Sequence, residues 1–246
     1  MEGTATRIAE RVNRVLNPGG YECAPFKVEW YNDIVDQPFK LNYPGDTLAV
    51  NVISAPSMYE DALKPFVETE IGCSSRDPLD DCTAFWFEKV VQEFASELQI
   101  EVLYDFLVAP SRRPLIIVQT SGHVSGQSFY YQRKDLIEDP WPRDKAIYGV
   151  SVHPTYGGWF AFRGVLIFVD MRVPNLERVE PPDVVPTNEK RVELLEKFNF
   201  HWKEWTFRDI IPVDVCYSDE MKKYLELPPG PRRRQYLGLD TDELLY

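Results

Sequence analysis

The chain has 246 residues, of which 44% are hydrophobic and 27% charged, so it is long and apolar enough to fold around a substantial core. Its net charge of −12 argues against general binding to nucleic acid or anionic membranes, because phosphate contacts need clustered cations. The four cysteines (Cys23, Cys73, Cys82 and Cys216) form no CxxC pair, which argues against a protein-bound metal and a disulfide scaffold. The first residues contain no apolar secretory segment, so we expect a cytoplasmic protein.

Hydrophobic periodicity predicts alternating elements along one domain that spans residues 1–246. In chain order we expect helix 4–16, strand 47–55, helices 57–70 and 77–96, strands 98–108, 115–120 and 159–169, and helices 188–198 and 202–210. Asp77 and Pro78 are typical of the cap and first turn of a helix. These elements predict an α+β fold in which helices flank a central mixed sheet.

Two long runs, residues 114–132 and 146–162, carry no charged side chain. Gly, Pro, Ser, Gln and His interrupt both runs, which excludes membrane spans, because a bilayer would leave such polar groups unsatisfied. A globular protein keeps such segments either as buried strands and turns or as the lining of a large ligand site. The sequence alone leaves both interpretations open.

Familiar catalytic motifs are absent from the chain. We find no GxGxxG, GxxxxGK[ST], HExxH or GxSxG motif, so Rossmann, P-loop, zincin and α/β-hydrolase chemistry lack their usual carriers. Any activity must therefore come from another arrangement of residues.

Three segments combine glycines, aromatic residues and a histidine or arginine. In the first, glycines flank His123, and Tyr130 and Tyr131 follow; this pattern fits either a flat ligand or a turn beside an amphipathic helix. In the second, Arg163 interrupts an apolar strand after a glycine turn, so it must face solvent or meet an anion. In the third, Arg208 lies in an aromatic run that is either a core contact or a site wall.

Together, these segments resemble the CblC (MMACHC) family of cobalamin-processing proteins. The resemblance is collinear from about residue 8 to about residue 240, and it rests on PGDTLAV (44–50), ALKPF (62–66), ELQIEVLYD (97–105), RRP (112–114), QTSGHVSG (119–126), YYQR (130–133), HPTYGGWFAFRGV (153–165), VPT (185–187) and FNFHWKEWTFRD (198–209). It implies a nitroreductase-like α+β fold of flavoreductase architecture. Longer relatives have a Pro-rich tail, whereas here we expect only a short extension from about residue 230.

The resemblance also implies a cobalamin site. Members of this family bind cobalamin with its dimethylbenzimidazole tail detached from cobalt and held in a separate pocket. The matching positions are Asp105, Ile116, Ile117, Val118, Gln119, Tyr130, Tyr131, Gln132, Ser151 and Phe162. Ser151 stands where well-studied relatives have a cysteine, which puts a thiol role there in doubt.

The resemblance further implies a glutathione site at three arginines, Arg163, Arg208 and Arg232. Arginine suits a tripeptide with two carboxylates, because its guanidinium group binds carboxylates bidentately. Arg232 also belongs to an arginine triplet that would otherwise be solvated surface. His123 resembles the histidine of HxxG cobalamin modules, but we expect it in the pocket wall rather than on cobalt.

The expected activity is the removal of upper axial ligands from cobalamin. Glutathione would accept alkyl groups from alkylcobalamins, and glutathione or a reduced flavin (FMN or FAD) would drive the loss of cyanide from cyanocobalamin. No protein nucleophile is needed, so no catalytic residue is predicted. Expected partners are an MMADHC-like adaptor and methionine synthase, and the protein would be a monomer or weak homodimer. The alternatives are a non-catalytic B12 chaperone and a flavin-dependent nitroreductase-like enzyme.

Overall fold

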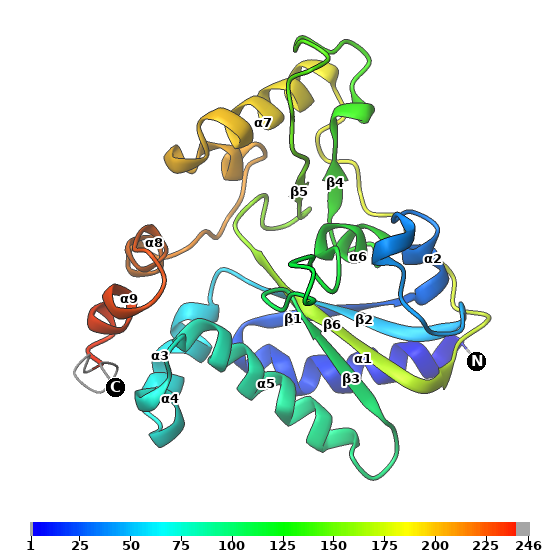
Figure 1. Cartoon of the computed structure of the whole chain (residues 1–246), viewed down its shortest axis with the longest axis vertical. Helices are drawn as coiled ribbons and strands as arrows, with labels where there is room; N and C mark the ends of the chain where they lie inside the picture. The colour runs from blue at the N-terminus through cyan, green and yellow to red at the C-terminus, as the bar shows by residue number, and fades with distance from the viewer. Residues whose placement is uncertain (1, 240–246) are drawn as a thin grey trace.

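The computed structural model describes residues 2–239, which fold around a four-stranded sheet (Figure 1). The strand order is β1 (Tyr21–Lys27), β2 (Thr47–Ser54), β6 (Ala161–Arg172) and β3 (Ile100–Tyr104). Two shorter strands, β4 (Phe129–Tyr131) and β5 (Val150–Val152), pair with each other outside this sheet. The α+β class predicted from the sequence is therefore confirmed.

The central sheet is antiparallel, so the prediction of a mixed sheet was wrong. Each neighbouring pair, β1–β2, β2–β6 and β6–β3, is antiparallel. Helices connect β2 to β3, and these two strands run in the same direction because both pair antiparallel with β6. Since β6 lies between them, this parallel relation contributes no hydrogen-bonded pair.

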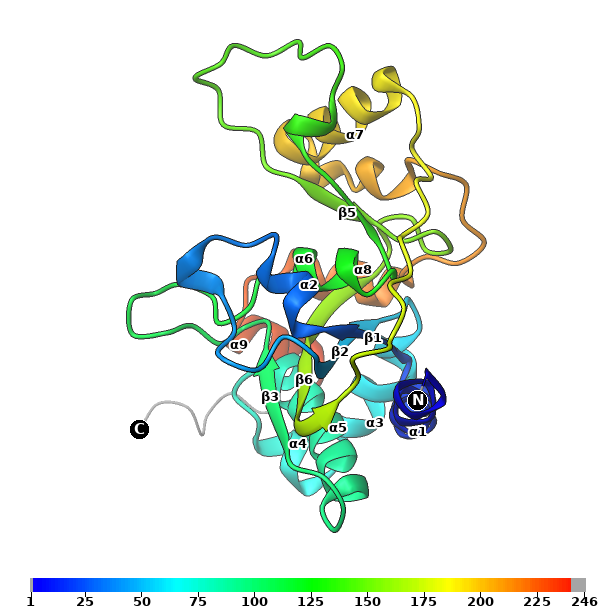
Figure 2. The same ribbon diagram turned by 90° about the vertical axis from the view of Figure 1, so that its right-hand side faces the viewer.

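Helices cover both faces of the sheet (Figures 1 and 2). Alternate β2 side chains enter different cores, because successive residues of a strand point to opposite faces. Leu48 packs in the core that contains residues of α1 (Glu2–Leu16) and α5 (Pro78–Phe94), whereas Ala49 packs with residues of α2 (Val28–Asn32) and α6 (Val118–Val124). All eight β2 residues are buried, as expected of a strand covered on both faces.

A third core lies away from the sheet, at the top of Figure 1. There Val150 and Val152 of β5 pack with Leu194 and Leu195 of α7 (Asn188–Phe200). We call β4, β5 and α7 the β4–β5 module. This module forms one side of the large cavity described below.

The remaining helices are short. They are α3 (Lys64–Val67), α4 (Glu70–Ser74), α8 (Asp219–Glu226) and α9 (Pro231–Tyr236). The predicted C-terminal extension begins at α9, and its last residues, 240–246, lie outside the described part of the chain. Among residues 2–239, no helix is long and apolar enough to cross a membrane.

Several predicted elements have the expected bounds. The helix predicted at residues 4–16 is α1, and Asp77 caps α5 by accepting a hydrogen bond from the Asp80 N–H. The strand predicted at 115–120 was wrong, because α6 begins at Val118. A short buried apolar run fits either element, and here the Ser121 hydroxyl donates to the Val118 carbonyl within a helical turn.

Candidate functional site

A large cavity with a volume of about 1090 Å³ lies between the β4–β5 module, α6, α8 and the turns at residues 202–209. Six of its thirteen lining residues are aromatic: Tyr130, Tyr148, Phe198, Trp202, Trp205 and Phe207. Lys203 and Arg208 contribute positive charge, and Gln119 and Asn199 contribute amides. Apolar walls with a few polar groups suit a large, flat ligand that carries hydrogen-bonding groups at its edge.

Arg208 lies among four aromatic rings at this cavity. Its guanidinium carbon is 4.9 Å from the ring centroid of Phe207, 5.0 Å from Trp205, 5.1 Å from Tyr217 and 5.7 Å from Trp159. A cation over aromatic rings is stabilised by their quadrupoles. Among described residues, its buried Nε has no hydrogen-bond partner.

Trp159 and Trp205 form the base of this arrangement. Their rings stack with centroids 6.0 Å apart and an interplanar angle of 4°. The Trp159 indole N–H also donates to Asp209 Oδ1 over 2.6 Å, so Asp209 is bound by the tryptophan and not by Arg208. Trp205 adopts a left-handed backbone conformation (φ 63°), which divides the helix predicted at 202–210 into two 3₁₀ turns, Trp202–Glu204 and Thr206–Asp209.

The glycine turn before β6 positions Arg208. The Gly158 N–H donates to the Arg208 carbonyl over 2.9 Å, and the Arg208 guanidinium donates back to the Gly158 carbonyl. A Cβ atom at Gly158 would lie 2.7 Å from the Arg208 Cα, so only glycine allows this approach. The turn predicted at Gly157 and Gly158 is therefore confirmed, and it packs directly against Arg208.

His153 closes the same turn. Its Nδ1 accepts hydrogen bonds from the N–H groups of Thr155 (3.1 Å) and Tyr156 (3.3 Å), and its backbone pairs with Gly157. Burial lowers the pKa of His153 to about 4, so the ring is neutral near pH 7. The neutral ring can accept both hydrogen bonds, which holds the turn in place beside Arg208.

A second, smaller cavity of about 160 Å³ lies on another side of Tyr130. It is lined in part by His123, Phe129 and Gln132. His123 Nδ1 accepts a hydrogen bond from the Tyr130 N–H over 3.2 Å, and burial lowers the pKa of this histidine. One ring nitrogen is therefore engaged by the protein, while the ring itself lines the cavity.

The ten positions matched to cobalamin have several different environments. Gln119 and Tyr130 line the large cavity, and Tyr130 and Gln132 line the small one. Ser151 pairs with Tyr130 across β4 and β5, and its buried hydroxyl has no partner among described residues. Phe162 packs so closely against α6 that a Cβ at Gly122 would lie 2.3 Å from its ring.

Ser151, Phe162 and the remaining matched positions are not among the lining residues of either cavity. Ile116 is buried in the core beside α2 and α6, with Ile117 and Val118 packed against it. The Tyr131 hydroxyl donates to Asp183 Oδ1 over 2.7 Å and accepts from the Val185 N–H over 2.8 Å. The Tyr131 hydroxyl therefore uses both its donor and an acceptor position in hydrogen bonds within the protein.

The half-buried Asp105 and the buried Arg163 form a separate charged group near the N-terminus of α5. Arg163 is 6% exposed, and its Nε donates to the Ser54 hydroxyl over 2.9 Å. Burial raises the pKa of Asp105, although the nearby Arg163 opposes this shift. Burial, followed by repulsion from Asp77 and Asp105, raises the pKa of Asp80 to about 7.

The three predicted arginines have different surroundings. Arg208 lines the large cavity, Arg163 is buried on β6, and Arg232 is exposed on α9. The lining residues of the large cavity therefore include one of the three.

Several lining residues were not predicted as site residues. Trp202 and Phe198 belong to the aromatic run noted in the sequence, and Tyr148 belongs to the second uncharged run. Leu225 and Glu226 of α8 have no distinguishing sequence signal. They reach the cavity only because α8 folds back beside the turns at residues 202–209.

Comparison with known proteins identifies the family. Residues 20–236 match the model of the methylmalonic aciduria and homocystinuria type C family. The chain belongs to this family. A Gallus gallus relative named cyanocobalamin reductase / alkylcobalamin dealkylase is 50% identical over 95% of this chain and 97% of its own length. A Homo sapiens relative with the same name is 44% identical over 97% of this chain and 84% of its own length.

A solved structure supports the same relationship. The crystal structure of a C. elegans B12-trafficking protein CblC, described as a human MMACHC homologue, has 30% sequence identity and a TM-score of 0.84. The alignment covers 98% of this chain and 99% of that one. The family resemblance found in the sequence is therefore confirmed, and the fold is shared over nearly the whole chain.

Proposed function

We propose that this protein processes vitamin B12 by removing the upper axial ligand of cobalamins. Its reactions would be the reductive loss of cyanide from cyanocobalamin and the dealkylation of alkylcobalamins by glutathione. The observation that carries the proposal is 50% identity, over 95% of the chain, with a relative named for both reactions. The large aromatic cavity supports it, because a corrin is flat, mostly apolar and surrounded by amide groups.

Cobalamin is the substrate in this proposal, and it would lie in the large cavity with its tail detached. Gln119 and Tyr130 offer an amide and a hydroxyl to the edge of the corrin, and the aromatic walls exclude water from its face. The small cavity beside His123 and Gln132 has room for one bicyclic base but not for a corrin. We infer that it receives the detached dimethylbenzimidazole, with His123 in the wall.

Dealkylation would use the sulfur of glutathione as nucleophile. The thiolate attacks the alkyl carbon, a carbon–sulfur bond forms as the cobalt–carbon bond breaks, and both electrons of that bond remain on cobalt. The products are a thioether and cob(I)alamin, and the thiol proton is released. Arg208 would bind a glutathione carboxylate, since its guanidinium group lines the cavity and a cation also favours the thiolate. Arg163 and Arg232 would complete the site.

Decyanation needs an electron donor. One electron reduces cobalt from the trivalent to the divalent state, and cyanide then leaves with its own electron pair. We propose that glutathione or a reduced flavin supplies the electron. The aromatic walls around Trp202 and Trp205 suit a flavin ring, and Lys203 and Arg208 suit its phosphate. Delivery of the product to an MMADHC-like adaptor and methionine synthase, by a monomer or weak homodimer, remains part of this proposal.

The direct test is to mix the purified protein with methylcobalamin, then add glutathione without oxygen. We expect a change in the visible spectrum on binding, from the tail-attached to the tail-detached form. Glutathione should then produce reduced cobalamin and S-methylglutathione, identified by mass spectrometry. A mixture without protein is the control.

Two outcomes would contradict dealkylation. Tight binding with an intact cobalt–carbon bond would select a chaperone, a role that fits the structural neighbour, which is named as a B12-trafficking protein. Retention of FMN through purification, with no spectral change on adding cobalamin, would instead select a flavin-dependent reductase.

Ser151→Ala tests whether this hydroxyl meets the ligand. The buried hydroxyl has no partner in the described structure, so its removal should not lower the free energy of unfolding and could raise it by up to about 1 kcal/mol. Methylcobalamin binding should weaken several-fold if the hydroxyl contacts the corrin. Chemical denaturation and spectral titration measure the two effects. Lower stability with unchanged affinity would show that Ser151 is only structural.

A further inference from the structure

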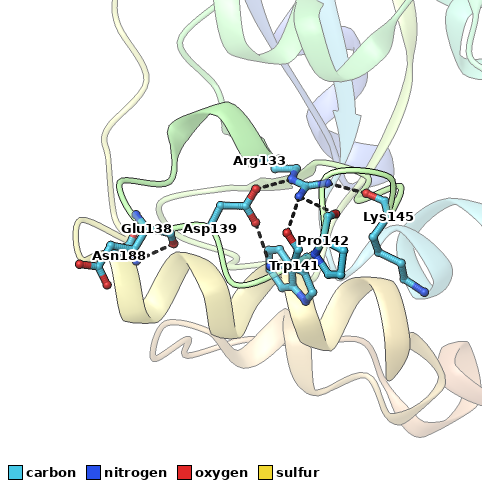
Figure 3. Close-up of polar contacts among 7 residues, drawn as sticks. All are labelled: Arg133, Glu138, Asp139, Trp141, Pro142, Lys145 and Asn188. Atoms are coloured by element: carbon cyan, nitrogen blue, oxygen red, sulfur yellow. Dashed lines mark hydrogen bonds and ion pairs between the residues drawn. The ribbon is translucent and has the colours of Figure 1, made fainter.

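Arg133 anchors the long segment between β4 and β5 (Figure 3). Its Nε donates to Asp139 Oδ2 over 2.6 Å. Its two terminal nitrogens donate to the main-chain carbonyls of Lys145 (2.5 Å), Trp141 (2.8 Å) and Pro142 (2.9 Å). One guanidinium group therefore joins four points of a segment that has no helix or strand between residues 136 and 149.

Two asparagines of α7 hold the ends of this segment. Asn188 accepts hydrogen bonds from the N–H groups of Ile137 (2.7 Å) and Glu138 (3.2 Å), and it donates to the Glu138 carbonyl. Asn199 accepts from the Tyr148 N–H over 2.8 Å and donates to the Tyr148 carbonyl over 3.0 Å. The ends are thus fixed to α7, whereas Arg133 holds the middle together with Trp141 and Ile147, which pack against the third core.

The segment leads directly into the wall of the large cavity. Tyr148 and Gly149, its last residues, both line the cavity. A Cβ atom at Gly149 would lie 2.6 Å from the Tyr130 ring, so the backbone here packs against a second lining residue. The side chain of Tyr148 stands at the cavity and is 71% exposed, although Asn199 holds its backbone. A shift of the segment would move this wall.

A lysine could not replace Arg133 in this role. The planar guanidinium presents five N–H donors in fixed directions, which matches one carboxylate and three carbonyls at the same time. A lysine ammonium has three donors on a flexible stem, and it would leave several of these acceptors to water. The substitution preserves the charge while removing the geometry.

We propose that Arg133 is a positioning residue of the cobalamin site, which acts together with Asn199 to fix Tyr148 and Gly149 in the cavity wall by ordering residues 136–147. This inference rests on the proposed function. It predicts that the order of the segment and the binding of cobalamin are linked, so each stabilises the other.

The test compares Arg133→Lys with Arg143→Lys, in which an exposed arginine of the same segment receives the same substitution. Trypsin reports order without any ligand, because it cleaves after Lys145 inside the segment. We expect Arg133→Lys to be cleaved there roughly tenfold faster than wild type and to bind methylcobalamin roughly tenfold more weakly. Its kcat at saturating methylcobalamin should stay within about twofold of wild type, since the reacting groups are unchanged. Arg143→Lys should match wild type in every measurement.

Saturating methylcobalamin should restore slow cleavage after Lys145 in Arg133→Lys, because binding stabilises the ordered segment. Asp139→Asn weakens one of the four contacts, so it should give smaller changes of the same kind in cleavage rate and in methylcobalamin affinity. It replaces Arg133→Lys as the test if that variant does not fold. Equal cleavage rates in Arg133→Lys and Arg143→Lys would overturn the ordering role. Faster cleavage with unchanged methylcobalamin affinity would overturn the link to the site. If wild type does not bind methylcobalamin, the proposed function fails, and with it the positioning role, even if the cleavage difference remains.

Discussion

Replacing Arg208 with alanine is expected to lower glutathione-dependent demethylation of methylcobalamin about 10- to 100-fold. The loss of one charge-assisted contact to a carboxylate costs about 1.5–3 kcal/mol. Methylcobalamin affinity should change by only a few-fold, because Arg208 is one of thirteen lining residues and the aromatic walls remain. The measurements are initial demethylation rates over a range of glutathione concentrations and a separate cobalamin titration.

Two variants make this test specific. Arg208→Lys keeps the positive charge but loses the fork-shaped group, so its rate should lie between wild type and Arg208→Ala. Arg14→Ala removes an exposed arginine from α1, and it should behave as wild type. If Arg208→Ala lost cobalamin affinity as strongly as rate, Arg208 would be a contact to the corrin or a structural residue instead.

Acidification should destabilise the protein through His153. Burial lowers the pKa of this histidine to about 4 from an ordinary value of 6.5. Between these pH values His153 is therefore protonated in the unfolded chain and neutral in the folded chain. This contribution to stability is complete above about pH 6.5 and is lost as the pH falls toward 4. Its full size is about 3 kcal/mol. Chemical denaturation at a series of pH values measures it.

The His153→Asn variant isolates this effect. The Asn side-chain oxygen lies close to the place of Nδ1 and can accept from the N–H groups of Thr155 and Tyr156, but it does not titrate. Asp80 contributes with the opposite sign, because burial raises its pKa to about 7 and its stabilisation is lost as the pH rises. The decisive quantity is therefore the difference in pH slope between variant and wild type. Equal slopes would show that His153 does not carry the effect.

The sequence predicted those helices whose own residues contain a capping signal or the apolar spacing of a helix. The Asp77 cap and Pro78 mark the start of α5, and the apolar spacing over residues 4–16 marks α1. β1 gave no clear signal, because Pro25 lies within it. The sheet order shows why Pro25 is tolerated, since β1 is an edge strand. The position of a strand at the edge of a sheet depends on distant parts of the chain, so it cannot be predicted from the residues of β1 alone.

The candidate site was predictable only in part for the same reason. Gln119, Tyr130 and Arg208 were expected from motifs, and all three line the large cavity. Tyr131 differs from Tyr130 by one position, yet it faces the core, because successive strand residues point to opposite sides. Leu225 lines the cavity only because the chain brings α8 beside it, and no local sequence signal indicates this position.

Three of the six tryptophans gather at the large cavity: Trp202 and Trp205 line it, and Trp159 stacks beneath Trp205. A corrin absorbs light strongly in the region where indole rings emit, so a bound cobalamin should quench most of their fluorescence by energy transfer. The protein thus carries an intrinsic optical reporter of its own occupancy, and binding of each variant can be followed without attaching a dye.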